Sequence, residues 1–300
     1  MRRSLIVAGM LAGLLFGAAR LGAEEMVLFN MKTTGADAWS WGQAQASWDA
    51  GELVVTENNK LKAHGDIFLS DRLPYLPGGE VLMDVGQVLA GSYTLQVLAF
   101  QGNSFLLSSD LIHDALKPGP RTATLNTAGL PPFTDGILFK IWVANAEGAA
   151  IRIKDFKYFA TLDPTNLIYD RVVEATTPVE LDRLTWTPVE NAGATIALIT
   201  NESYGSVLFT DPIPKPDTGT LMIQIPSVKR GSLTVQFAAL DGAGQYLSAL
   251  DVIKRVGAGW RSTQLASLSW PEGTKSFQIK IWLEGVEEAS ATITRLIVLR

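Results

Sequence analysis

Apolar and polar residues alternate in short runs along most of the chain, and turn residues separate these runs at intervals of roughly 8 to 15 positions. A period of two is typical of half-buried β-strands, because successive side chains of a strand point to opposite faces. In the first half of the chain the pattern predicts strands over residues 26–30, 51–56, 66–70, 80–85, 92–100, 122–125, 137–143 and 150–159. Such a set predicts an all-β, jelly-roll-type sandwich of two sheets.

Two kinds of segment break the alternation. Residues 109–116 are predicted as a short helix, and residues 250–256 as its counterpart further along the chain. Residues 73–79 contain two prolines and end in two glycines. Because proline cannot donate to a strand ladder and glycine permits positive φ, this segment is predicted as a turn.

The chain repeats itself. Shifted by 140 positions, residues 65–160 align with residues 205–300 without a gap, and 24 of the 96 positions are identical. Identical pairs include Gly65/Gly205, Gly91/Gly231, Gln96/Gln236, Leu107/Leu247, Ser108/Ser248, Lys140/Lys280 and Trp142/Trp282. Upstream, after a change of register, Trp41 aligns with Trp186, and Val54-Val55-Thr56 with Leu198-Ile199-Thr200. The repeat predicts two tandem sandwich domains related by internal duplication, over residues 24–162 and 163–300, joined by the short segment 161–166.

Parity separates the faces of the strands that are best defined. The predicted core faces are Tyr93, Leu95, Val97 and Ala99; Ile137, Phe139, Ile141 and Val143; Leu233, Val235, Phe237 and Ala239; and Phe277, Ile279, Ile281 and Leu283. The opposite faces carry the same polar and aromatic residues in both copies, namely Gln96, Lys140 and Trp142, and Gln236, Lys280 and Trp282. These six residues are the candidate ligand-binding residues.

An aromatic ring beside an amide and a cation on one sheet face suits sugar recognition. The ring stacks on the C–H face of a pyranose while the polar groups bind its hydroxyls. The alternative is surface packing, in which the Lys stem simply covers the Trp ring beneath a loop or a neighbouring domain.

Several stretches resemble carbohydrate-binding modules and galactose-binding-like jelly rolls. They are the Trp-rich opening with Trp48-Asp49-Ala50-Gly51-Glu52-Leu53, the strand from Gly91 to Phe100, the late Lys-Ile-Trp strand, and the closing Ile151-Arg152-Ile153-Lys154-Asp155-Phe156. The resemblance is one of spacing and covers both copies. It implies a concave-face cleft that holds the six residues named above.

A second candidate surface lies in the first copy alone. Trp39 and Trp41 share a face if that segment is extended, and Trp48 follows shortly after. Together these rings predict either an exposed loop platform for a sugar or a hydrophobic plug at the end of the sandwich.

The N-terminus predicts export. Residues 1–23 have two arginines, a 15-residue apolar stretch from Leu5 to Ala19 and a small-residue cleavage site after Ala23, which together read as a secretory signal peptide. Its removal leaves 22 basic and 30 acidic residues. An acidic chain is a poor nucleic-acid binder. Without cysteine it has no disulfide, thiolate nucleophile or lipid-anchor cysteine. We expect a periplasmic, extracellular or cell-surface bacterial protein with no membrane segment after cleavage.

Metal and catalytic signals are weak. Glu24, Glu25, Asp49 and Asp155 are candidate ligands for a structural calcium ion in the first copy, whereas Arg295 stands where a second copy of Asp155 would lie. Neither His64 nor His113 is repeated, and no nucleophile elbow, zinc-binding helix motif or phosphate loop occurs. We therefore expect no catalytic residues and no cofactor. A glycoside-active enzyme remains the alternative, because a glycosidase needs only two carboxylates and the sequence has many.

Two functions fit this sequence. The first is a secreted, non-catalytic protein that binds a polysaccharide or surface glycan on a Trp/Gln/Lys sheet face in each copy. The second is a structural or assembly subunit of the periplasm or cell surface, such as a filament sheath or surface layer, which associates with itself or with another surface protein.

Overall fold

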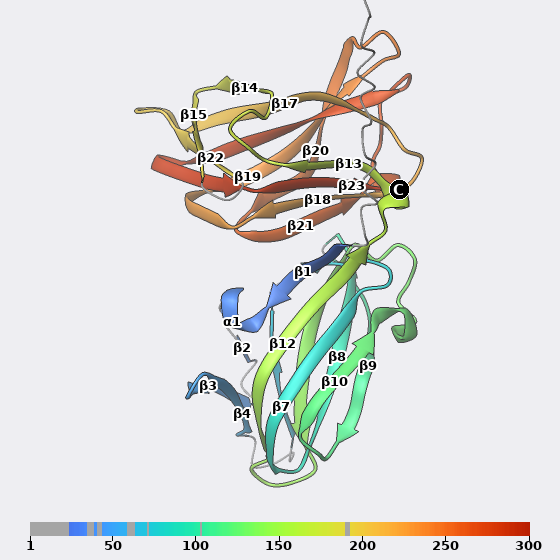
Figure 1. The fold of residues 1–300 in the computed structure, drawn as a ribbon, viewed down its shortest axis with the longest axis vertical. Coiled ribbons are helices and arrows are strands. Elements are labelled where there is room, and N and C mark those ends of the chain that lie inside the picture. Colours follow the sequence, from blue (N-terminus) through green and yellow to red (C-terminus); the bar gives the residue numbers. More distant parts are fainter. Residues whose placement is uncertain are drawn as a thin grey trace, which may run out of the picture.

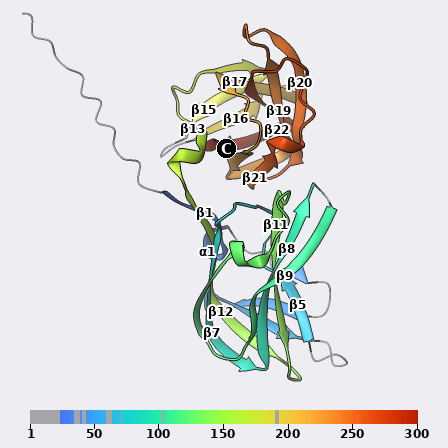
Figure 2. The ribbon, with the colours of Figure 1, turned by 90° about the vertical axis from the view of Figure 1, so that its right-hand side faces the viewer.

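The computed structural model describes residues 24–34, 39–40, 44–58, 64–70, 72–102, 104–189 and 193–300. Within these ranges the chain is all-β and its strands form two pairs of antiparallel sheets (Figures 1 and 2), which confirms the predicted fold class. We call the pair built from β1 to β12 the first sandwich and the pair built from β13 to β23 the second. The duplication of one unit remains a prediction.

Two sheets make up the first sandwich. One has the order β10 (Gly119–Thr124), β7 (Glu80–Ala90), β12 (Ala150–Leu162), β4 (Glu52–Glu57) and β3 (Ala44–Asp49), with β1 (Glu24–Asn30) paired to β12. The other has the order β2 (Trp39–Ser40), β5 (His64–Phe68), β11 (Gly136–Ala144), β8 (Ser92–Gln101) and β9 (Ser104–Ala115), with β6 (Leu73–Pro74) paired to β11. From β4 to β12 the chain crosses repeatedly between the sheets, as in a jelly roll.

The second sandwich also has two sheets. The smaller has the order β13 (Leu167–Val172), β23 (Arg295–Leu299), β18 (Thr220–Ile225) and β21 (Gly259–Gln264). The larger has the order β14 (Val179–Asp182), β17 (Tyr204–Pro214), β22 (Ser276–Ile293), β16 (Ala194–Leu198) and β15 (Leu184–Pro188), and β19 (Ser227–Leu240) joins β22 to β20 (Tyr246–Val256).

Helices are few and short in the described ranges. They are α1 (Met31–Thr34) and three 3₁₀ turns, Leu125–Ala128, Pro164–Asn166 and Leu265–Ser267. No helix of the described ranges has the length and hydrophobicity needed to cross a lipid bilayer.

The predicted core faces are confirmed. All sixteen residues assigned to them by parity are fully buried in the interiors of the two sandwiches. In the first sandwich, Phe139 packs edge-on against Phe156 and Tyr158, with ring centroids 5.2 and 5.3 Å apart. In the second, Phe237 and Phe277 have ring centroids 4.3 Å apart. Removing this much apolar surface from water is the main stabilising term of each sandwich.

The predicted helices are wrong. Residues 109–116 fall mostly in β9, and residues 250–256 lie in β20. Both strands pair with a neighbour, β8 or β19, through three register irregularities. Because each bulge adds a residue to one strand, the side chains of β9 and β20 do not keep a simple period of two. Apolar residues at positions 111, 112, 115 and 116 therefore imitate the spacing of an amphipathic helix.

The gapless alignment is wrong in the same strands. Leu98 pairs with Ser108 in the first sandwich and Ala238 with Ala249 in the second, so β9 and β20 correspond at a shift of 141. At β10 and β21 the shift is 140 again, since Gly119 pairs with Val85 and Gly259 with Ile225. One residue added in the β19–β20 hairpin is removed before β21. The identities Leu107/Leu247 and Ser108/Ser248 are therefore not structurally equivalent.

The upstream alignment is also wrong. Trp186 pairs with Ile196 in the second sandwich, and Ile196 pairs with Ala291. In the first sandwich the row that passes through Ile151 contains Ala46 and Val55. Trp186 therefore corresponds to Ala46 rather than Trp41. It is half-buried and packs against Phe209 at a centroid distance of 6.2 Å.

The proline-rich turn begins later than predicted. Leu73 and Pro74 form the two-residue strand β6, which pairs with Ile137 and Gly136 at the beginning of β11. The Pro74 carbonyl also accepts a hydrogen bond from the hydroxyl of Tyr158, at 3.1 Å. Proline is tolerated here because it lies at the end of a short ladder, where no further donor is required.

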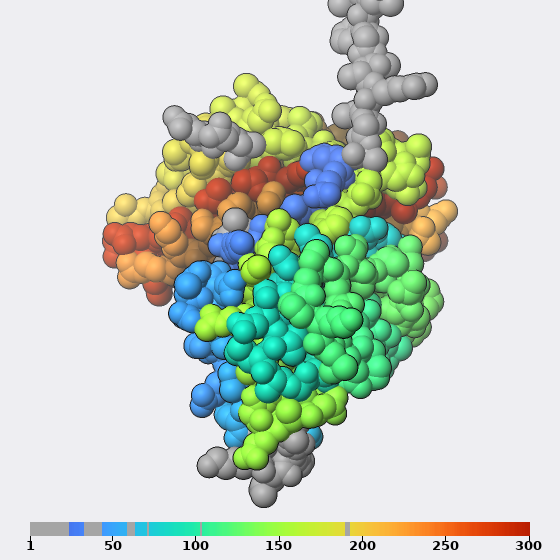
Figure 3. All heavy atoms as spheres, turned by 60° about the horizontal axis from the view of Figure 1, so that its bottom comes forward, coloured from blue at the N-terminus to red at the C-terminus, as the bar shows by residue number. Residues whose placement is uncertain are grey.

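The two sandwiches are in direct contact. Met222, Trp260 and Ile297 of the second sandwich are buried in the same apolar cluster as the core of the first. The Ser262 hydroxyl donates to the carbonyl of Asp135 at 3.1 Å across the boundary. Figure 3 shows residues of β1, in blue, against the second sandwich, where the carboxylate of Glu24 binds Arg295 at 2.8 Å.

Replacing Tyr158 with Phe tests the polar contact inside the first core. The buried hydroxyl accepts from the Leu76 amide and donates to the Pro74 carbonyl, both at 3.1 Å. Its loss leaves two buried backbone groups unpaired, so we expect Tyr158→Phe to lower the free energy of unfolding by about 1–3 kcal/mol. Urea denaturation measures the change. Tyr75→Phe is the control, since the half-buried Tyr75 hydroxyl makes no hydrogen bond among the described residues, and equal losses in both variants would contradict the assignment.

Candidate functional site

The six candidate residues lie on the outer face of one sheet in each sandwich, the sheet that contains β8 and β11 in the first and the larger sheet in the second. In the first sandwich Lys140 and Trp142 of β11 lie opposite Gln96 and Thr94 of β8. Since paired residues share a face, these side chains point the same way, away from the core. In the second sandwich Lys280 and Trp282 of β22 lie opposite Gln236 and Thr234 of β19 in the same register. All six candidates are half-buried.

A chain of hydrogen bonds links Trp, Gln and Asp in both sandwiches. In the first, Trp142 Nε1 donates to Gln96 Oε1 at 2.6 Å, and Gln96 Nε2 donates to Asp110 Oδ1 at 2.7 Å. In the second, Trp282 Nε1 donates to Gln236 Oε1 and Gln236 Nε2 donates to Asp251 Oδ1, both at 2.5 Å. We call Gln96, Asp110, Lys140 and Trp142 the first Trp cluster, and Gln236, Asp251, Lys280 and Trp282 the second.

The chemistry of these groups sets the direction of the chain. An indole N–H can only donate, so the Gln oxygen must face the ring, and the Gln amino group must then face an acceptor. The carboxylate supplies that acceptor and makes the bond charge-assisted. Each Trp ring is thus held in one orientation by two successive hydrogen bonds.

A lysine covers one face of each indole. Lys140 Nζ lies 4.2 Å from the Trp142 ring centroid, and Lys280 Nζ lies 4.3 Å from that of Trp282. These are cation–π contacts. Lys140 also pairs with Asp66 of β5 at 3.8 Å, and burial lowers the pKa of Lys140. The residue that corresponds to Asp66 is Ser206, so the second lysine has no such carboxylate.

A second ring lies beside each Trp on the next strand. His64 of β5 is 5.4 Å from Trp142 between ring centroids, and Tyr204 of β17 is 6.1 Å from Trp282. Arg183 lies over the Tyr204 ring at 4.4 Å. The two positions correspond at a shift of 140, so the second cluster has a two-ring apolar surface that the first lacks.

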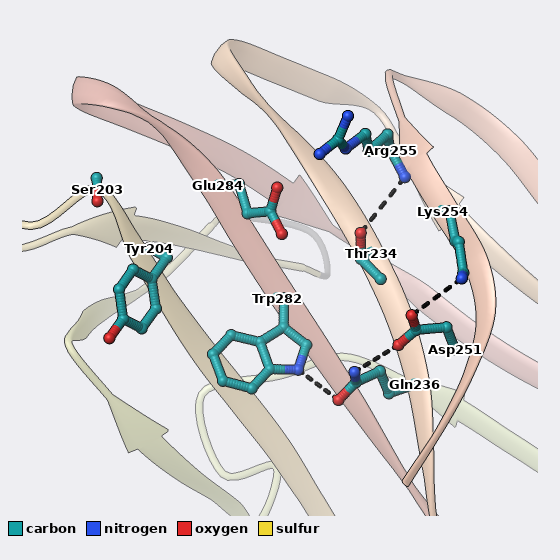
Figure 4. A pocket seen from close by; sticks show the side chains of 9 residues that line it. All are labelled: Ser203, Tyr204, Thr234, Gln236, Asp251, Lys254, Arg255, Trp282 and Glu284. Carbon is teal, nitrogen blue, oxygen red and sulfur yellow. Dashed lines mark hydrogen bonds and ion pairs between the residues drawn. The ribbon is translucent and has the colours of Figure 1, made fainter.

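An open hollow of about 800 Å³ lies over the second Trp cluster (Figure 4). Its lining comes from four strands and the loop before them, and consists of Ser203, Tyr204, Thr234, Gln236, Asp251, Lys254, Arg255, Trp282 and Glu284. Two aromatic rings form one side of the hollow, and amide, carboxylate and cationic groups form the other. This mixture of apolar and polar groups is typical of small-ligand sites.

The electrostatics of the second cluster favour an ionised Asp251. The hydrogen bond from Gln236 lowers the pKa of this carboxyl, and Lys254, 3.2 Å away, lowers it further, while partial burial acts in the opposite direction. The charged carboxylate keeps the Gln236 amide in place.

Asp110 and Asp251 were missed by the sequence analysis. At a shift of 140, Asp110 aligns with Leu250, and the correspondence is lost. At the observed shift of 141 the segments Asp110-Leu111-Ile112-His113-Asp114 and Asp251-Val252-Ile253-Lys254-Arg255 share the order acid, aliphatic, Ile, basic, charged. An alignment that allowed a gap in the hairpin would have found this signal.

The tryptophan platform remains a prediction. Trp41 lies outside the described residues, as does the side chain of Trp39. The backbone of Trp39 pairs with Phe68, which in turn pairs with Lys140, so β2 extends the row of the first Trp cluster. Trp48 is 47% exposed on β3, which belongs to the other sheet.

Three of the four candidate calcium ligands make ion pairs. Glu24 binds Arg295 at 2.8 Å, Asp49 binds Arg152 at 2.7 Å and Asp155 binds Lys157 at 3.0 Å. Within the part of the chain that the structure describes, no three acidic or histidine side chains are arranged to hold a metal ion. Calcium binding remains a prediction.

No protein-family model matches the chain, and no curated protein matches its sequence. Among solved structures, it is similar to the CBM22-1–CBM22-2 tandem of Xyn10C from Paenibacillus barcinonensis, at 10% identity over 93% of this chain and 99% of that one, with a TM-score of 0.31. A structure of carbohydrate-binding modules from the β-sandwich superfamily has 11% identity, coverage of 86% and 98%, and a TM-score of 0.31. Allantoicase has 9% identity, coverage of 92% and 90%, and a TM-score of 0.24.

Replacing Gln236 with Leu tests the Trp–Gln–Asp chain. The hydrogen bond from Gln236 is the largest cause of the lowered Asp251 pKa, so its removal should raise that pKa towards the ordinary aspartate value. The stability that this bond contributes is present above the pKa of Asp in the unfolded chain and is lost as pH falls through the lowered folded value. Carboxyl ¹³C NMR follows the titration.

The matched control is Gln278→Leu. Gln278 lies on β22 near the same cluster, and its amide donates to the Thr210 carbonyl instead. This variant should leave the Asp251 titration unchanged. An Asp251 midpoint that stays the same in Gln236→Leu would contradict the chain of hydrogen bonds.

Proposed function

We propose that this chain is an exported, non-catalytic carbohydrate-binding protein that uses the outer sheet face around Trp142 and Trp282. The observation that carries the proposal is the same Trp–Gln–Asp chain, with a lysine on the indole, in both sandwiches. Export rests on the predicted signal peptide, residues 1–23.

Surface packing accounts poorly for this arrangement. A Trp ring that served only to pack would also need an acceptor for its indole N–H. Packing does not explain why Asp251 and Lys254, which continue the chain of contacts from Gln236, are exposed rather than covered by the neighbouring sandwich. Tyr204 is 41% exposed at the edge of the hollow. Groups held rigid before a ligand arrives lose little conformational entropy on binding, which favours affinity.

The second hollow suits a pyranose ring. Since Lys280 covers one side of the Trp282 indole, the sugar would contact the part of the ring that faces Tyr204 and the hollow. Its hydroxyls would form hydrogen bonds with the Gln236 amide, which can donate and accept, and with the Asp251 carboxylate, which can accept. Two such surfaces in one chain would raise avidity for a polymer only if both can engage it together.

The alternative, an assembly subunit, has support from a different surface. Phe105 and Tyr246 correspond at the tips of the β8–β9 and β19–β20 hairpins, where their side chains are 56% and 63% exposed. Aromatic side chains are enriched in protein–protein contact surfaces. If the chain assembles through these tips, mass measured by light scattering will rise with concentration and fall in the double variant Phe105→Ser/Tyr246→Ser.

Replacing Trp142 and Trp282 with Ala tests the proposed function. Loss of both rings removes the apolar surface for the sugar, so we expect binding of soluble polysaccharide to weaken at least about tenfold per site. Isothermal titration calorimetry with a polysaccharide panel measures the affinity, and circular dichroism monitors folding. Leu89→Ala, which truncates an exposed apolar side chain on β7 of the other sheet, should bind as the native chain does.

A second variant keeps this test decisive if the double variant fails to fold. Tyr204→Ala removes an exposed ring and leaves the Trp–Gln–Asp chain intact. Retention of full affinity in folded Trp142→Ala/Trp282→Ala or in Tyr204→Ala at the second hollow would count against the proposal, as would native chain that binds no member of the panel.

A further inference from the structure

The two Trp clusters differ most at a β-bulge beside them. In β9, His113 and Asp114 together lie opposite Thr94, since Leu95 pairs with Ile112 and Tyr93 with Ala115. In β20, Lys254 and Arg255 lie opposite Thr234 in the same way. The backbone amides of Asp114 and Arg255 donate to the hydroxyls of these two threonines, at 3.0 and 3.4 Å.

This bulge directs corresponding side chains towards the two clusters. Asp114 and Arg255 both have positive φ, 41° and 50°, which is uncommon for residues other than glycine. Bulges of this kind turn a side chain out of the normal alternation and are frequent beside binding sites. The residue at this position therefore determines much of the local charge, and it is an acid in one sandwich and an arginine in the other.

The surrounding residues change in the same direction. The first cluster and the residues beside it include three carboxylates, of which Asp66 pairs with Lys140, Asp110 accepts from Gln96 and Asp114 accepts from Thr94, and one lysine, Lys140. Around the second cluster, Ser206 stands in place of Asp66, and Lys254 and Arg255 stand in place of His113 and Asp114. Lys254, Arg255 and Lys280 there face two acids, Asp251 and Glu284.

Arg255 also has hydrogen-bond donors that are available to a ligand. Asp114 accepts bonds from Ser92, Thr94 and Asn145, so its carboxylate is occupied. The exposed guanidinium of Arg255 makes no hydrogen bond or ion pair with any residue that the structure describes. Figure 4 shows its side chain extending back over β19, towards the side of the hollow that holds Glu284. Lys254, in contrast, is paired with Asp251.

We infer that the second hollow binds an acidic saccharide, with the sugar carboxylate on the Arg255 guanidinium and the pyranose ring against Trp282 and Tyr204, and that the first Trp cluster disfavours the same ligand. The inference rests on the proposed function and names the ligand class of one of its two surfaces. A planar guanidinium with five donors matches a carboxylate by two parallel hydrogen bonds. Lys280, which has no carboxylate partner in the described structure, adds attraction at longer range.

Calorimetry with one ligand in two charge states tests this inference. The probes are oligomers of galacturonic acid and the same oligomers as methyl esters, which keep the pyranose ring and lose the charge. The protein is the mature chain carrying Trp142→Ala, so that the second hollow dominates the signal. We expect the acid form to bind at least tenfold more tightly than the ester, and increasing salt to narrow the difference.

Arg255→Asp is the decisive variant. It places in the second sandwich the residue that the first has in the same backbone conformation, so the fold should be retained. We expect it to weaken binding of the acid form at least tenfold and to leave ester binding within about twofold. Lys229→Asp is the matched control, because it makes the same charge change at an exposed position on β19 away from the hollow; it should bind both forms as the parent does.

The outcomes separate the inference from the proposed function. If the ester binds as tightly as the acid, or if Arg255→Asp and Lys229→Asp behave alike, the acidic-saccharide inference is overturned while sugar binding stands. If sulfated oligomers bind more tightly than the carboxylates, the selection is for charge density rather than for a carboxylate, which overturns the assigned group. If neither form of the probe nor any neutral polysaccharide binds the native chain, the proposed function itself fails.

Discussion

The rest of this structure depends on one constraint, the burial in the core of one face of four strands, β8, β11, β19 and β22. Over residues 93–99, 137–143, 233–239 and 277–283 every second side chain is fully buried, and a slip of one residue would bring Lys, Gln and Trp into that interior. The register is therefore held by the free energy of burying aromatic and branched side chains. As a consequence, the outer faces of both sheets present Trp, Lys and Gln in the same geometric order, whatever surrounds them.

The Trp–Gln–Asp chain extends this order from backbone to side chain. Trp142 and Gln96 are not directly opposite in the ladder but lie one row apart, so the indole N–H meets the amide on a diagonal. The carboxylate that completes the chain comes from β9 or β20, each of which pairs with its neighbour through three register irregularities. A regular ladder positions two members of the chain, and a bulged strand supplies the third.

This difference decides how much the sequence could predict. The strands and their core faces follow from alternation, since tertiary burial imposes a period of two on them. β9 and β20 could not be found in this way, because bulges break that period and produce an apparently helical spacing. The same bulges and a hairpin one residue longer hid the equivalence of Asp110 and Asp251. The outer candidates Gln96, Lys140 and Trp142 were found because they lie on regular strands, whereas their acidic partner and Arg255 do not.

The two sandwiches also show which residues can change without loss of the scaffold. The hydroxyls of Thr94 and Thr234 each accept a hydrogen bond from the backbone amide of a bulge residue. This contact does not depend on the side chain of the bulge residue. The same backbone conformation can therefore carry an acidic residue, Asp114, in one sandwich and a basic residue, Arg255, in the other. Replacement of Gln96 or Gln236, in contrast, would leave an indole N–H without its acceptor. Selectivity at such a face is free to vary at the bulge because the orientation of the aromatic ring is determined elsewhere, by the regular strands.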